Sequence, residues 1–86
     1  MIMDEKDLPL QDKILLILHN LCVVQPSFAK TGEEISKIIH LSIDHVLKIL
    51  TFHEQQGYIE SFTDKIGLKR FYLSGIGIIK VCSSFT

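Results

Sequence analysis

The chain has 86 residues, a length that suits one small domain over residues 1–86. Hydrophobic residues make up 47% of it and charged residues 22%, which excludes a disordered tail and a fibrous protein. The net charge is −1 and only two cysteines are present. A strongly polycationic coat protein and a disulfide-rich secreted scaffold are therefore excluded as well.

The start of the chain carries no targeting pattern. Residues 1–7 are acidic, and we expect a flexible N-terminus there rather than a signal or transit peptide. The longest apolar run, Ile14 to Leu18, has five residues, whereas a helix needs about 20 to span a bilayer. With so few cysteines, this pattern predicts a cytoplasmic protein without a membrane span.

The first helix is predicted to begin near Pro9, because proline is favoured in a first helical turn. An apolar face at helical spacing is formed by Ile14, Ile17, Leu18 and Leu21. Gln25 precedes Pro26, and a residue before proline avoids the helical conformation. The helix is therefore predicted to end there.

Two further helices follow. Residues 31–34, Thr-Gly-Glu-Glu, form a capping box that opens a short helix ending near His40. Ser42 is a candidate N-cap for a longer helix that reaches Gln56, and Gly57 suits the left-handed position after it. The positions expected to face inward are Val46, Ile49 or Leu50, and His53. A short helix, a turn and a longer helix make the helix-turn-helix plan, whose second helix fits the major groove of DNA.

The hydrophobic period changes from helical to alternating after residue 57. Residues 58–63 and 68–73 predict two strands joined by a tip at 64–67, and a last helix is expected over 75–83 after the cap Ser74. The fold class expected is α+β, with a three-helix core, a two-stranded β-hairpin and a C-terminal helix.

Charge is unevenly distributed along the chain. Residues 31–60 carry two lysines and five acidic residues, a net charge of −3. Residues 61–86 carry four basic residues and one aspartate, a net charge of +3. Lys65, Lys69 and Arg70 lie on the predicted hairpin, where basic side chains can contact adjacent DNA phosphates without reading sequence.

Four segments between residues 31 and 77 carry a family resemblance. They read TGEEIS at 31–36, LSIDHV at 41–46, HEQQGYIE at 53–60 and FYLSGIG at 71–77. In this order and spacing they resemble winged helix-turn-helix transcription regulators, the group that includes the MarR-like and PadR-like repressors. The compact, isoleucine-rich build is also similar to small winged-helix proteins of archaea and their viruses.

The resemblance implies a homodimer that binds double-stranded DNA and regulates transcription, as a repressor rather than an activator, in the cytoplasm at the nucleoid. The groove-facing positions it implies for the second helix are Ser42, Asp44, His45, Leu47, Lys48 and Thr51. Leu47 is expected to pack on thymine methyl groups, and Asp44 either accepts from cytosine or serves only as a helix-start anion. The first and last helices carry more apolar residues than one core uses, and we expect them to pair the subunits.

One alternative is a protein-interaction module that never touches DNA. Its docking face would be formed by Ile43, Leu47, Ile49 and Phe52. The acidic net charge of residues 31–60 favours this alternative, because it repels phosphate.

Neither an enzyme nor a cofactor, metal or small-molecule effector is indicated. The chain has no argued pairing of a nucleophile with histidine and carboxylate, and its four histidines and two cysteines lack compact metal-site spacing. His53 is expected in the core, bonded to a backbone carbonyl, and Cys22 is expected to be buried. For Cys82 two interpretations stay open, a buried thiol and a disulfide or redox switch between subunits.

Overall fold

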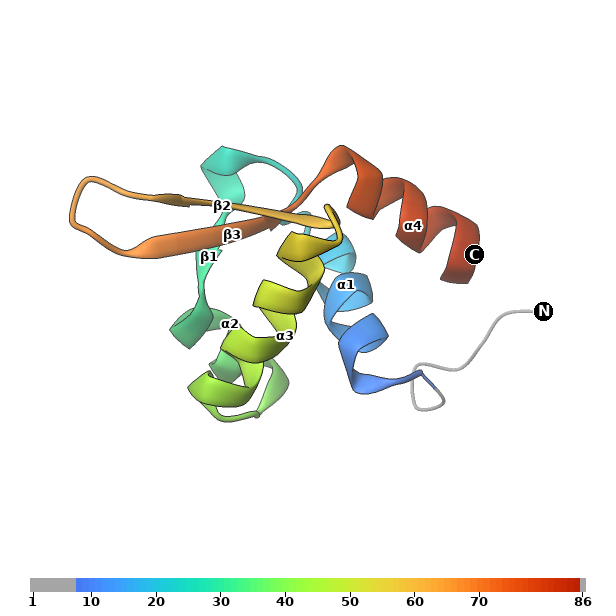
Figure 1. The fold of residues 1–86 in the computed structure, drawn as a ribbon, viewed down its shortest axis with the longest axis horizontal. Coiled ribbons are helices and arrows are strands. Elements are labelled where there is room, and N and C mark those ends of the chain that lie inside the picture. Colours follow the sequence, from blue (N-terminus) through green and yellow to red (C-terminus); the bar gives the residue numbers. More distant parts are fainter. Residues whose placement is uncertain (1–7, 86) are drawn as a thin grey trace.

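The computed structural model describes residues 8–85, and the predicted flexible N-terminus lies outside these residues. Within them are four α-helices and a small antiparallel sheet, whose β2–β3 hairpin projects away from the helices (Figure 1). In chain order the elements are α1 (Leu10–Asn20), the 3₁₀ helix η2 (Pro26–Phe28), β1 (Lys30–Thr31), α2 (Gly32–Ile39), α3 (Ile43–Gln55), β2 (Ile59–Thr63), β3 (Lys69–Leu73) and α4 (Gly75–Phe85). The predicted α+β architecture is confirmed.

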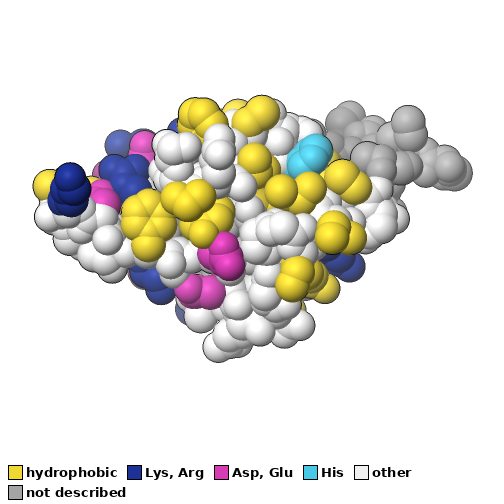
Figure 2. Space-filling model, turned by 90° about the horizontal axis from the view of Figure 1, so that it is seen from above, with side chains coloured by type: hydrophobic (Ala, Val, Ile, Leu, Met, Phe, Trp, Pro, Cys, Tyr) yellow, Lys and Arg dark blue, Asp and Glu magenta, His cyan; other side chains and the backbone are white. Residues whose placement is uncertain are grey.

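The sheet has the strand order β1-β3-β2, with both pairings antiparallel. Strands β2 and β3 form the wing, a hairpin whose ends pair Ile59 with Leu73 and Thr63 with Lys69. The wing extends at one end of the molecule, where side chains of both charges lie close together (Figures 1 and 2). The prediction had two strands and missed β1, because a two-residue strand is too short to show alternation and its pairing with β3 is a tertiary contact.

The predicted end of the first helix at Gln25 is wrong, since α1 ends at Asn20. Cys22 adopts a left-handed φ of 61°, and the Val23 N–H donates to the Leu18 carbonyl at 2.9 Å. This is a Schellman ending, which is commonest with glycine in the place of Cys22. Val23 turns into the core while Cys22 points outward, so the expectation of a buried Cys22 is also wrong.

The predicted starts of α2 and α3 are confirmed by their caps. The Thr31 hydroxyl accepts from the Glu34 N–H at 3.1 Å, and the Glu34 carboxylate accepts from the Thr31 N–H at 2.9 Å. This arrangement is a complete capping box. The hydroxyl of Ser42 accepts from the His45 N–H at 3.2 Å. Gly57 follows α3 with φ 85°, as its position predicted.

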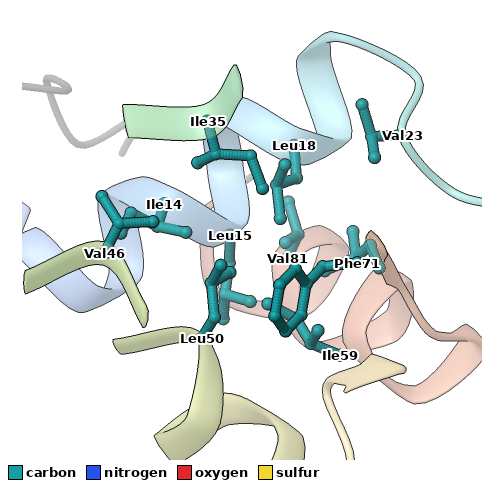
Figure 3. Packing of buried hydrophobic residues seen from close by; sticks show 11 residues of the cluster. Ile14, Leu15, Leu18, Val23, Ile35, Val46, Leu50, Ile59, Phe71 and Val81 are labelled. Carbon is teal, nitrogen blue, oxygen red and sulfur yellow. The ribbon is translucent and has the colours of Figure 1, made fainter. Parts of the chain in front are cut away.

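The hydrophobic core lies between the helices and one side of the sheet (Figure 3). Every α-helix and both long strands contribute to it, through Ile14, Leu15, Leu18, Val23, Ile35, Val46, Leu50, Ile59, Phe71, Leu73 and Val81. Gly77 lets α4 approach this core closely, because a Cβ there would overlap the backbone oxygen of Tyr58. The core thus fixes α3 and the wing on one scaffold.

His53 is a buried residue of α3, only 2% exposed, as predicted. Its Nε2 lies 2.7 Å from the backbone oxygen of Gln11 in α1, whereas its Nδ1 is buried without a hydrogen-bond partner. Burial disfavours the charged ring and lowers the pKa of His53 below its ordinary value of 6.5, although the Gln11 carbonyl acts in the opposite direction. The ring therefore holds α3 against α1 in its neutral form.

We expect the protein to lose stability as the pH falls below about 6.5, because the unfolded chain then takes up a proton at His53 that the folded chain resists. Each unit of pKa difference contributes about 1.4 kcal/mol. Urea unfolding between about pH 7.5 and pH 5 measures the slope, which His53→Leu should flatten. His45→Gln, at an exposed position of the same helix, is the control and should keep the slope. Equal slopes in the wild type and His53→Leu would contradict the assignment.

Candidate nucleic-acid interface

Helix α3 presents one side to the core and the other to solvent. Val46, Leu50 and His53 are buried on the inner side. All six positions predicted to face a DNA groove are exposed, namely Ser42, Asp44, His45, Leu47, Lys48 and Thr51. Exposure is a requirement for a recognition helix, but the six positions do not share one face, since His45 lines a hollow with Ile49 and with Leu10 and Gln11 of α1.

A shallow hollow of about 350 Å³ lies on this outer side, and we call it the α3 hollow. It is lined by Leu47, Lys48, Thr51, Phe52 and Gln55. Phe52 and Gln55 were not among the predicted DNA-contacting residues. Their spacing of four from Lys48 and Thr51 is a signal that could have placed them on the same face.

The part of the wing next to its tip lies beside the outer side of α3. A second hollow of about 200 Å³ is shared by the start of α2, by Ile43 and Leu47 of α3, and by Leu68, Lys69 and Phe71 around β3. Gly32 permits this close packing, because a Cβ there would lie 2.8 Å from Cδ2 of Leu47. Lys69 and Leu47 thus border one continuous surface, as the helix-and-wing prediction requires.

Arg70 is engaged within the chain. Its Nε donates to Oδ2 of Asp64 at 2.7 Å, and its Nη1 lies 3.4 Å from Oε1 of Glu34 and 3.3 Å from the backbone oxygen of Ala29. The side chain is half-buried, and these bonds tie β3 to the start of α2. The guanidinium of Arg70 is therefore engaged within the chain, and its contact with DNA stays a prediction.

Asp64 organises the tip of the wing. Its Oδ1 accepts from the N–H groups of Ile66 and Leu68 at 3.0 and 2.9 Å, while Oδ2 accepts from Arg70. The Arg70 hydrogen bond is the largest of the effects that lower the pKa of Asp64, followed by the Leu68 amide. The tip is consequently held in one conformation with Lys65 exposed.

Lys69 is an exposed wing residue with a nearby carboxylate. Its Nζ lies 3.5 Å from Oε1 of Glu54 and 5.3 Å from the centre of the Phe71 ring. Glu54 also accepts from the hydroxyl of Ser61. An exposed ion pair of this kind contributes at most about 1 kcal/mol, so Lys69 can exchange its partner for a phosphate.

Further exposed apolar side chains lie on α4 and just after α1. Ile76 and Ile79 of α4 are 60% and 68% exposed, and Leu21 after α1 is 46% exposed. Helix α4 packs against α1, so these side chains belong to neighbouring elements. Cys82 is also exposed on α4, so the interpretation of Cys82 as a thiol buried within the chain is wrong. Its disulfide alternative stays a prediction.

No group of three metal-ligating side chains gathers among residues 8–85. In the same part of the chain, none of the helices combines the length and apolar character needed to cross a membrane.

Solved structures with the same fold belong to a bacterial regulator. MepR of Staphylococcus aureus, described as a transcription regulator of the multidrug efflux pump MepA, superposes with a TM-score of 0.72 at 22% identity, covering 95% of this chain and 54% of MepR. Its complex with DNA gives the same TM-score at 21% identity, covering 95% and 60%. The chain thus spans little more than half the length of these proteins. The likeness confirms the winged-helix fold. No family model and no curated protein matches the sequence.

We expect Asp64→Ala to loosen the wing tip without unfolding the domain. Removal of two backbone hydrogen bonds should accelerate amide exchange at Ile66 and Leu68 about fivefold or more. In the wild type these bonds should persist to below pH 3.8, because the pKa of Asp64 is lowered and its anionic form is kept. NMR-detected amide exchange at Ile66 and Leu68 measures the acceleration in the variant and, as a function of pH, the persistence of the bonds in the wild type. Glu33→Ala, which breaks an exposed pair with Lys37, is the control. Unchanged exchange in Asp64→Ala would refute the role of Asp64.

Proposed function

We propose that the chain binds double-stranded DNA as a homodimer and regulates transcription, most simply as a repressor that excludes polymerase from its site. The observation that supports this most is the shared surface of α3 and the wing. Leu47 lines both the α3 hollow and the second hollow, which it shares with Lys69 of the wing. A recognition helix in the major groove would then bring the wing lysines to the flanking phosphates.

In this proposal the DNA-binding residues divide into two groups. Lys65 and Lys69 neutralise phosphates, while Lys48 and Thr51 contact base edges. Ser42, Asp44 and His45 lie at the exposed start of α3, where Ser42 is already bonded to the His45 amide. Arg70 supports the wing from behind. The protein would act in the cytoplasm, at the nucleoid.

Salt dependence tests the phosphate contacts. For a dimer touching about six phosphates, the logarithm of the binding constant should fall against the logarithm of salt concentration with a slope near −5. Lys69→Gln removes one phosphate interaction per subunit, or two per dimer, and should change the slope to about −3.6. Arg70→Gln should lower affinity while leaving the slope nearly unchanged, because its guanidinium is bonded within the chain.

Fluorescence anisotropy with a labelled random-sequence duplex gives these slopes. A flattened slope in Arg70→Gln together with an unchanged one in Lys69→Gln would reverse the assignment of the two residues. No binding of any duplex at low salt would refute the proposed function.

The exposed side of α4 is the proposed subunit interface. We expect Ile79→Glu to convert the dimer into a monomer, because a charge there would have to be buried on association. Sedimentation velocity measures the change. Ile66→Glu, an exposed residue at the wing tip, is the matched control and should remain dimeric. A wild-type protein that sediments as a monomer would contradict the interface.

A protein-docking module is the second candidate. It is favoured by the exposure of Ile43, Leu47 and Phe52, at 43%, 37% and 45%. Ile49, the fourth predicted member of that face, is half-buried against the core. Sedimentation with and without a duplex at low salt separates the two functions, since only the first gives a faster-sedimenting complex.

A further inference from the structure

We propose that α3 recognises A·T base pairs in the major groove through apolar contacts with thymine methyl groups. This inference rests on the proposed DNA-binding function and names the base pairs that the α3 surface selects.

The outer side of α3 has the composition for this recognition. Ile43, Leu47 and Phe52 are all more than a third exposed. Thymine is the one DNA base with a methyl group in the major groove, and apolar side chains recognise it there. Guanine is most often read by a bidentate arginine or lysine, yet α3 has no arginine and a single lysine, Lys48.

The α3 hollow brings an apolar wall and an amide together. Leu47 and Phe52 line it with Gln55, whose side-chain amide can donate to and accept from the edge of adenine. Its volume of about 350 Å³ is several times the ~30 Å³ that a water-sized group occupies, so it can receive a methyl group. Both partners of an A·T pair therefore find a matching group in one depression.

The charges beside the apolar surface favour DNA over a protein as its occupant. Lys48 lines the α3 hollow, and the neighbouring hollow is lined by Lys69 and Glu33 together with Ile43 and Leu47. Each hollow thus joins an apolar wall to a lysine, an arrangement that complements a base edge bordered by phosphates.

Replacing thymine with deoxyuridine tests the inference directly, because uracil pairs with adenine but lacks the methyl group. Duplexes selected by the wild-type protein from a random-sequence pool should be enriched in A·T pairs. Resynthesis of a selected duplex with deoxyuridine should weaken binding about fourfold for each thymine methyl group that α3 recognises, as estimated from the transfer of one methylene group out of water.

Two variants separate methyl recognition from a general change of duplex shape. Ile43→Ala and Leu47→Ala should each reduce the ratio of affinities for the thymine and uracil duplexes. Ile38→Ala is the matched control, since Ile38 is 41% exposed on α2 and lines a different hollow with α1. Circular dichroism melting confirms that each variant is folded.

The outcomes distinguish this inference from the proposed function. Tight binding with equal affinity for the two duplexes, or an unchanged ratio in both α3 variants, would overturn methyl recognition and leave DNA binding intact. Enrichment of G·C pairs would overturn it in the same way. Failure to bind any duplex would refute DNA binding itself. A protein partner would then be the remaining candidate for the exposed side chains of Ile43, Leu47 and Phe52.

Discussion

The rotation of α3 about its own axis is the constraint on which the candidate interface depends. Val46 and Leu50 are fully buried, and the burial of each side chain stabilises the fold by about 1.5–3 kcal/mol. His53 adds a hydrogen bond to the backbone of α1. Turning the helix by one residue would bring Leu47 inward and expose Leu50. The same burial that stabilises the domain therefore determines which side chains are exposed at the candidate interface.

The strands of the wing are anchored in the same core as α3 through Ile59, Phe71 and Leu73, and polar contacts hold the part of the wing nearer its tip. Arg70 joins the wing to the start of α2, and Asp64 fixes the turn that presents Lys65. The carboxylates of Glu34, Glu54 and Asp64 thereby compensate much of the positive charge of the hairpin. With a net charge of −1, the chain as a whole has little general attraction for polyanions.

Helix ends separate the parts of the fold that local sequence predicts from those that it does not. The caps at Thr31, Ser42 and Gly57 are predicted correctly, because each has a side chain or a conformational freedom typical of its cap. Cys22 and His40 hold left-handed positions at two other helix ends, at φ 61° and 59°. Neither residue type predicts this conformation, and the burial of Val23 after Cys22 compensates for it.

The sequence by itself determined the order of the helices, the hairpin and its tip, and the buried positions of α3, because periodicity and capping depend on neighbouring residues alone. Tertiary structure decided that Arg70 supports the wing and that β1 joins the sheet. Asp64 is close to Arg70 in sequence, but Glu34 and Ala29 are more than thirty residues away. Whether a cation is turned outward or engaged within the chain depends on such distant partners, which only the folded chain brings within hydrogen-bond distance.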